Sequence, residues 1–129
     1  MPTHSQIPFN SLQLSPRRMD KPTTLEECMI ALTKILSIEE QAQLTKMTED
    51  ELGDTHHGLG QWLRNNWDLW KGGPLLEHMK SLGFIHPDDM SHSIIKEFWN
   101  RLNDRPSQIQ EDIKYYAEYW GNKGGALRD

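Results

Sequence analysis

The sequence predicts an all-α fold, a compact single domain of five or six short helices. Three Ser or Thr residues are each followed by Glu three positions later: Thr24 by Glu27, Ser37 by Glu40, and Thr48 by Glu51. Such capping boxes start helices, because the hydroxyl accepts a hydrogen bond from the Glu amide and the Glu carboxylate accepts one from the first amide. Apolar residues then recur at helical spacing, and no segment shows the alternation of a half-buried strand.

The length of 129 residues suits one hydrophobic core. Residues 1–22 contain four prolines and no apolar period, so we expect an irregular N-terminal arm, either disordered or laid partly across the domain. The helical domain is expected over residues 23–121. Residues 122–129 are expected to form a flexible tail.

Two helices are expected at the start of the domain. The first follows the Thr24 capping box and carries an apolar stripe that consists of Leu25, Met29, Leu32 and Leu36. The second is short and extends over residues 38–46. The third capping box is expected to begin another helix.

Glycines interrupt this third helical segment, at Gly53, Gly58 and Gly60. Each weakens a helix interior by about 1 kcal/mol relative to alanine, so we expect a break or a tight helix contact over residues 53–60. A firm helix is then expected from about Leu59 to Trp70, with its three tryptophans near one face. We expect it to lie at the centre of the fold, against residues 25–36 and 90–102.

Three further helices are expected, over residues 75–82, 87–102 and 109–120. Gly83 is expected just beyond the first of them, where glycine commonly ends a helix. His86 precedes a proline and should therefore have an extended backbone. The next helix begins with Asp88 and Asp89, whose carboxylates are favoured near a helix N-terminus.

The charge of the chain favours a cationic partner. It has 19 acidic residues against 14 Lys and Arg, a formal net charge of −5 with neutral histidine. No basic run extends beyond Arg17 and Arg18, so the phosphate backbone of a nucleic acid is disfavoured as a partner. An acidic surface attracts and orients a basic protein instead.

Cysteine content and hydropathy favour a soluble, cytoplasmic protein. Cys28 is the only cysteine, which excludes an intrachain disulfide and favours an intracellular location. Its place on the apolar face of the first helix predicts an inert buried thiol. The N-terminus lacks the pattern of a secretory signal, and no apolar run is long enough to span a membrane.

Six side chains could in principle supply metal ligands: His56, His57, His86, His92, Asp88 and Asp89. Their spacing matches no strong metal signature, so we expect no metal ion or other cofactor. Ser91 lies beside His92 but on a helix, not on the sharp turn of a catalytic nucleophile. The glycines of residues 58–60 are not followed by the lysine of a phosphate-binding loop. Enzymatic activity therefore finds little support.

Arg64 has two interpretations. It could be a binding or catalytic guanidinium, or a structural clamp that binds a helix end or a carboxylate such as Asp88 or Asp89. We favour the clamp, because a buried arginine is usually paired. Asn65 and Asn66 are expected to tie loops to the helix through amide bonds to the backbone.

The last helix carries four aromatic residues. Tyr116 and Trp120 are expected to pack inward, whereas Tyr115 and Tyr119 are expected to be exposed. Exposed tyrosines four positions apart on a helix are useful interface anchors.

Two motifs resemble those of a small bacterial domain family of unknown function. Residues 56–70 read HHGLGQWLRNNWDLW, similar to the family pattern HxGxGxW[IL]RNxWxLW, and residues 83–91 read GFIHPDDMS, similar to G[IF]xHPDDMS. The resemblance covers about residues 24–103 and implies no particular activity. It implies that polar residues of the two motifs act together with Trp67. The structural polar network that we expect consists of His57, Arg64, Asn65, Asn66, His86, Asp88 and Asp89.

By analogy, small acidic helical proteins of bacteria often serve as immunity proteins that cover the active site of a toxin. We therefore expect a non-enzymatic protein-binding module, specifically a cytoplasmic inhibitor of a cognate toxin with a basic active-site face. The expected contact residues are Glu49, Asp50, Glu51, Asp54, Glu111, Asp112, Tyr115, Glu118 and Tyr119. The alternative is a metal-dependent or nucleotide-modifying enzyme centred on His57, Arg64, His86 and Asp88.

Overall fold

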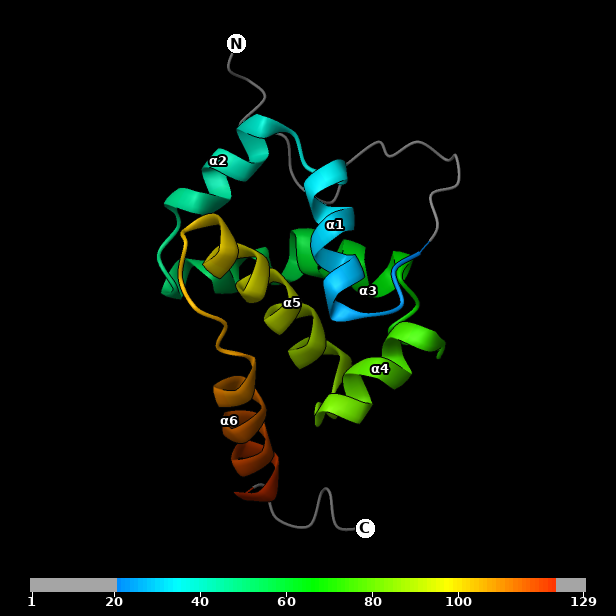
Figure 1. Cartoon of the computed structure of the whole chain (residues 1–129). Coiled ribbons are helices and arrows are strands. Elements are labelled where there is room, and N and C mark those ends of the chain that lie inside the picture. The colour runs from blue at the N-terminus through cyan, green and yellow to red at the C-terminus, as the bar shows by residue number, and fades with distance from the viewer. Residues whose placement is uncertain (1–20, 123–129) are drawn as a thin grey trace.

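Helix α5 (Pro87–Leu102) runs through the middle of the molecule and contacts most of the other helical segments (Figure 1). The computed structural model describes residues 21–122. The remaining helical segments are α1 (Leu25–Ile35), α2 (Ile38–Lys46), the 3₁₀ segment η3 (Asp50–Thr55), the π segment η4 (His56–Gly60), α3 (Gln61–Asn66), α4 (Pro74–Leu82) and α6 (Ile109–Asn122). No strand occurs within the described range, and the predicted all-α class is confirmed.

The capping boxes start their helices where the sequence predicts. The boxes that begin at Ser37 and Thr48 each make both of their hydrogen bonds. The second of these boxes begins the 3₁₀ segment η3 rather than an α-helix. At α1, the Thr24 hydroxyl accepts a bond from the Glu27 amide, but the Glu27 carboxylate accepts its bonds from the amide and hydroxyl of Thr23.

Residues 50–66 form one helical path whose winding changes twice. The path begins as the 3₁₀ segment η3, widens into the π-turn of η4 and continues as α3. Thr55, His56 and Gln61, at the junctions, all keep a right-handed helical backbone. Of the two alternatives expected over residues 53–60, a break or a tight contact, the structure shows the contact. It lies at Gly60, where an added Cβ would lie 3.1 Å from Nη1 of Arg64 and would also touch Oγ of Ser91 on α5, at 3.7 Å.

The predicted tryptophan helix ends earlier than expected. Helix α3 stops at Asn66, and residues 67–71 form turns. Trp67 is buried and meets Trp62 edge-on, with ring centroids 5.9 Å apart, but Trp70 is 55% exposed. The expectation that one helix carries all three tryptophans near one face is wrong, because Trp67 and Trp70 lie beyond the end of α3. Helix α3 does pack on α5, but α5 occupies the centre.

Gly83, just beyond the end of α4, lies where the backbone approaches α6 closely. It follows α4 as predicted and has a φ of 124°, which strongly favours glycine. An added Cβ would lie only 2.7 Å from Cγ2 of Ile113 on α6. Helix α6 begins where the Ser107 hydroxyl accepts a bond from the amide of Ile109, and it packs against α5.

The core is built around α5, which is buried on nearly all sides between Met90 and Asn100, and the other helices contribute apolar residues to it. Its fully buried members include Cys28, Leu32, Leu44, Leu63, Met79 and Ile94. Burial raises the pKa of the Cys28 thiol, in keeping with the predicted buried cysteine. Of the helices within the described range, none combines the length and the apolar character needed to cross a bilayer.

The expected arm and tail fall almost wholly outside the described residues. From the arm, the structure places Pro22, which is buried, and Lys21, whose Nζ lies 2.7 Å from Oδ2 of Asp68. The irregular arm over residues 1–22 and the flexible tail over residues 122–129 stay predictions.

Candidate functional site

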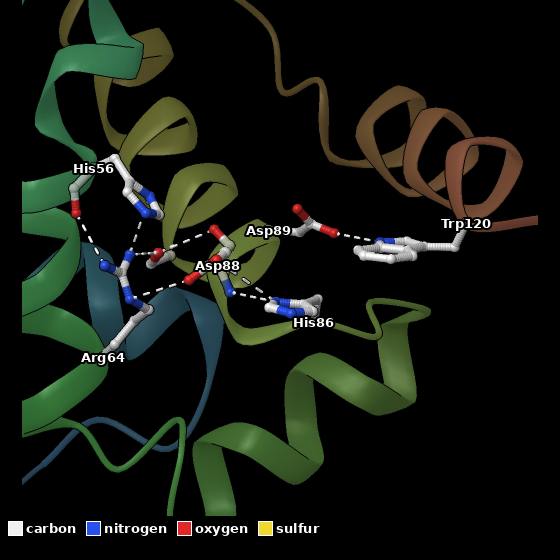
Figure 2. A network of polar contacts seen from close by, with 7 residues as sticks. His56, Arg64, His86, Asp88, Asp89 and Trp120 are labelled. Atoms are coloured by element: carbon white, nitrogen blue, oxygen red, sulfur yellow. Dashed lines mark hydrogen bonds and ion pairs between the residues drawn. The ribbon is translucent and has the colours of Figure 1, made fainter. Parts of the chain in front are cut away.

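Arg64 on α3 contacts three residues, one on η4 and two near the start of α5 (Figure 2). Its Nη1 donates to Oγ of Ser91 at 2.8 Å, and its Nη2 donates to the carbonyl oxygen of His56 at 3.0 Å. Its Nε lies 3.4 Å from Oδ1 of Asp88. Burial lowers the pKa of this guanidinium, and the charge of Asp88 opposes that shift. Arg64 thus makes the contacts that a structural clamp requires.

Gly60 provides the space that this guanidinium occupies. An added Cβ would lie 3.1 Å from Nη1 of Arg64 and 3.1 Å from the carbonyl oxygen of Thr55. Ser91 completes the cluster, because its hydroxyl also donates to the carbonyl of Asp88 at 3.1 Å. The first motif therefore supplies both the arginine and the glycine that lets the arginine fold back on η4.

The second motif begins α5 and points its two carboxylates apart. Nδ1 of His86 accepts a hydrogen bond from the Asp88 amide at 3.2 Å, so the imidazole caps the helix. Adjacent residues on a helix diverge, and Asp88 faces Arg64 while Asp89 faces Trp120 (Figure 2). Of the two carboxylates considered for the arginine, Asp88 is the partner.

Trp120, close to the end of α6, lies over this turn. Its Nε1 donates to Oδ2 of Asp89 at 2.9 Å, and its indole stacks on His86 with centroids 5.4 Å apart and an angle of 5° between the planes. Trp70 meets the same imidazole edge-on at 5.8 Å. Burial raises the pKa of Asp89, whereas the bond from Trp120 lowers it. Two tryptophans from distant parts of the sequence thus flank one histidine.

An open pocket of about 400 Å³ lies between α6 and the start of α5. It is lined by His86, Asp88, Asp89, Tyr115, Tyr116, Tyr119 and Trp120. Tyr115 and Tyr119 are exposed, and their rings are nearly parallel, with centroids 6.5 Å apart. Burial raises the pKa of the Tyr116 hydroxyl, which therefore stays neutral. The lining contributed by the described residues combines aromatic rings with carboxylates and includes no lysine or arginine.

The predicted acidic contact residues near η3 are all exposed: Glu49, Asp50, Glu51 and Asp54. Two of them also support the fold. The carboxylate of Glu49 lies 3.0 Å from Nζ of Lys96, and that of Glu51 accepts the Thr48 amide. Asp50 and Asp54 are exposed, and neither takes part in these two supporting contacts.

Four of the five predicted contact residues on α6 are exposed, and one is buried. Glu111, Tyr115, Glu118 and Tyr119 are exposed. Asp112 is buried, and its carboxylate lies 3.1 Å from Nζ of Lys96 and accepts a bond of 3.1 Å from the Ser93 hydroxyl. The expectation that Asp112 lies on the outer surface is therefore wrong. This residue ties α6 to α5.

Three members of the expected polar network lie outside both the Arg64 cluster and the turn that begins α5. Nδ2 of Asn66 donates to the carbonyl of Trp62 in the same helix, and Asn65 is exposed. The expectation that these asparagines tie loops to the helix is wrong for Asn66, whose bond stays within its own helix, and for Asn65 it stays a prediction. His57 is exposed and meets the ring of His56 edge-on at 4.7 Å.

The enzymatic alternative gains little from this geometry. Asp88 connects Arg64 with His86, but the guanidinium is bound on three sides by protein atoms and does not line the pocket. Across residues 21–122, no group of three or more His, Cys, Asp or Glu side chains is placed to hold a metal ion.

The sequence comparisons identify the scaffold of this site. Residues 21–102 match the model of a family described as a domain of unknown function (DUF6794). The chain belongs to this family. The DUF6794 segment contains the Arg64 cluster and the turn that begins α5, but it ends before α6. No curated protein and no solved structure gives a significant match.

Sequence reasoning did not identify Ser91, Ser93 and Lys96 as residues that shape this region. All three are buried polar side chains on α5. For Lys96 a signal was available, because it lies among apolar residues of a buried helix, where a charge requires a partner. The two serines offer no such signal, since a small hydroxyl is tolerated on either face of a helix.

Proposed function

We propose that this protein is a non-enzymatic protein-binding module that captures a basic partner. The binding surface, which we call the α6 face, consists of Glu111, Tyr115, Glu118 and Tyr119 together with the pocket beside them. The observation that carries the proposal is this pocket, in which aromatic rings and carboxylates lie together and open to solvent. Tyrosine and tryptophan are effective anchors of protein interfaces, and an acidic surface suits a basic partner.

Charge and exposure support this choice of surface. The chain has a formal net charge of −5, which attracts a cationic protein over several ångströms and speeds encounter. Tyr115 is 62% exposed and Tyr119 is 42% exposed, although a tyrosine on a helix surface can bury much of its ring. The exposed acids of η3 are a second, smaller candidate for contact.

The biological role that we propose for this capture is inhibition of a cognate bacterial toxin in the cytoplasm. The toxin would present a basic active-site face to the α6 face. The support is an analogy: a small, acidic, helical protein with an aromatic surface has the properties of an immunity protein. The enzymatic alternative is not proposed, because no observation of the structure favours it.

Isothermal titration calorimetry tests this proposal with the full chain and the protein encoded next to its gene. The α6-face variant carries Glu111→Gln, Tyr115→Ser, Glu118→Gln and Tyr119→Ser. A matched control carries Ile38→Ser, Glu39→Gln and Glu77→Gln, which alter exposed residues of α2 and α4. Circular dichroism verifies that both variants keep the helical fold.

We expect the α6-face variant to bind at least about tenfold more weakly, since interface tyrosines are frequent hot spots. The control should bind as the parent does. Equal losses in the two variants, or full affinity in the α6-face variant, would overturn the proposed surface. A neighbouring protein that does not bind the parent chain would overturn the toxin role.

A further inference from the structure

The pocket has the size of a site for one side chain rather than for a folded segment. Its volume of about 400 Å³ falls near the lower end of the range for small-ligand sites. Its walls come from two directions, with aromatic residues of α6 on one side and the first turn of α5 on the other. A partner residue that enters must therefore satisfy both an aromatic surface and a carboxylate.

We propose that the pocket receives the guanidinium of a single arginine from the partner protein. This inference deepens the proposed function and depends on it. Asp89 accepts the hydrogen bonds of the guanidinium, which stacks on the aromatic wall at Tyr119. The indole of Trp120, stacked on His86, lies beside it. Charge complementarity identifies the occupant, because the described lining contains two carboxylates and no lysine or arginine.

Asp89 rather than Asp88 is the acceptor. Asp88 already balances the buried guanidinium of Arg64, with Nε and Oδ1 3.4 Å apart. Within residues 21–122, the hydrogen bond to Asp89 comes from a neutral indole N–H at Oδ2, and no Lys or Arg forms an ion pair with this carboxylate. The same bond fixes the direction of the Asp89 carboxylate before the partner arrives, which reduces the entropy lost on binding.

Arginine suits the pocket better than lysine. A guanidinium is planar, donates two parallel hydrogen bonds to a carboxylate and stacks on aromatic faces, whereas an ammonium is a compact and strongly hydrated charge. The chain already shows this stacking elsewhere, since Cζ of Arg105 lies 4.5 Å from the ring centroid of Trp99.

The two halves of the pocket also differ in origin. Asp88 and Asp89 belong to the DUF6794 segment, but the aromatic residues of α6 lie beyond residue 102, where that segment ends. The carboxylates therefore lie inside the family segment, and the aromatic wall lies outside it. Recognition of an arginine requires both.

Nuclear magnetic resonance of the full chain tests the proposal with N-acetyl-arginine amide as the probe. The readout is the indole N–H resonance of Trp120, assigned with a Trp120→Phe variant among the five tryptophans of the chain. N-acetyl-citrulline amide has nearly the same shape as the arginine probe but no charge. N-acetyl-lysine amide has the charge but no planar group. Asp89→Asn removes the charge but keeps an oxygen that can accept the Trp120 bond, and Glu77→Gln is the matched control on α4.

We expect a saturable shift of the Trp120 resonance with the arginine probe and no saturable shift with the citrulline probe. Loss of the charged acceptor in Asp89→Asn, or of a stacking face in Tyr119→Leu, should weaken arginine binding by about fivefold or more. The Glu77→Gln control should bind the probe as the parent does. Equal binding of the three probes, an unchanged affinity in Asp89→Asn, or shifts confined to other indoles would overturn the proposal.

The two proposals can fail separately. If the arginine probe does not bind but the α6-face variant still loses the partner, the arginine pocket is wrong and the protein-binding surface stands. If the α6-face variant keeps full affinity for the partner, the surface itself is wrong, and the arginine pocket loses its function with it.

Discussion

Trp120 and Asp89, which are 31 positions apart, are joined by a hydrogen bond of 2.9 Å from indole to carboxylate. This bond holds the last part of α6 over the first turn of α5 and orients one wall of the pocket. It also connects a helix outside the DUF6794 segment with a motif inside it. The shape of the candidate site therefore depends on a contact that the family segment alone does not contain.

Replacing Trp120 with Phe keeps an aromatic ring but removes the hydrogen-bond donor. A bond to a charged group contributes about 1.5–3 kcal/mol, so amides over residues 116–121 should exchange with solvent about tenfold faster or more. Exchange in α5 should change little. Tyr115→Phe, an exposed neighbour, is the control, and unaltered exchange in α6 of Trp120→Phe would contradict the role of the bond.

Replacing Arg64 with Lys should destabilise the fold, because an ammonium cannot reach Ser91, the His56 carbonyl and Asp88 together. We expect the free energy of unfolding to fall by about 2–4 kcal/mol in urea denaturation. Asn65→Ala, on the exposed side of the same helix, should stay within about 0.5 kcal/mol of the parent. An equally small effect of Arg64→Lys would show that the clamp contributes little.

The ion pair between Lys96 and Asp112 should give strongly non-additive effects. Asp112→Leu leaves Lys96 with the exposed Glu49 as its acidic partner, and Lys96→Met leaves the buried Asp112 without its lysine. Each should lower the free energy of unfolding by about 2–4 kcal/mol, and Lys96→Met should have the larger effect. The double variant should be more stable than the sum of the two losses predicts, because both charges are gone. Additive losses in a double-mutant cycle would mean that the pair is not coupled.

Substitution of Gly83 by Ala should cost stability in two ways. The φ of 124° disfavours any side chain, and the new Cβ would meet Ile113 at 2.7 Å. We expect a loss of about 2 kcal/mol or more in the free energy of unfolding. Gly53→Ala is a matched control, since its Cβ would meet nothing within 4 Å. If Ile113→Ala does not reduce the cost of Gly83→Ala, the close approach is not its cause.

The stability of the protein should fall as the pH drops below neutrality. Burial lowers the pKa of His92 in the folded state from its ordinary value of 6.5, so protonation favours the unfolded chain. The charged groups that act on it are Asp112, Lys96, Asp89 and Glu49. Its contribution is fully present above the ordinary pKa and is lost as the pH falls toward the lowered one.

Urea denaturation between about pH 7.5 and about pH 5.5 measures this dependence. The free energy of unfolding should change less steeply with pH in His92→Gln than in the parent. Burial and the charge of Arg64 also lower the pKa of His56, so some dependence should remain in that variant. A slope that does not change in His92→Gln would contradict the assignment.

Local signals in the sequence predicted the start of most helices. The hydroxyls of Thr24, Ser37 and Thr48 and the proline at the start of α4 act within one turn, so no tertiary information is needed to place them. The end of α3 was not predictable in this way. Asp68 adopts a positive φ of 59° within the turns that follow, and nothing in its neighbours requires that conformation.

The candidate site was predictable only in part. The two motifs indicated that Arg64 and the turn at His86 lie together, since polar residues in a buried setting require partners. The burial of Asp112 could not be found from its own helix, because it depends on a lysine 16 positions earlier. The pocket likewise depends on how α6 docks, which is a property of tertiary packing.

The widened turn at residues 56–60 makes this segment tolerant of a one-residue change in length. A π-turn contains an additional residue relative to an α-turn, and the wide turn takes up that residue locally. Deletion of one residue there would restore ordinary winding and leave Arg64 facing α5. A deletion in the ordinary turns of α3 before Arg64 would instead rotate the arginine about the helix axis by about 100°, so that its guanidinium points away from Ser91. A homologous chain that is one residue shorter in this segment can keep the clamp only if the missing residue belongs to the wide turn.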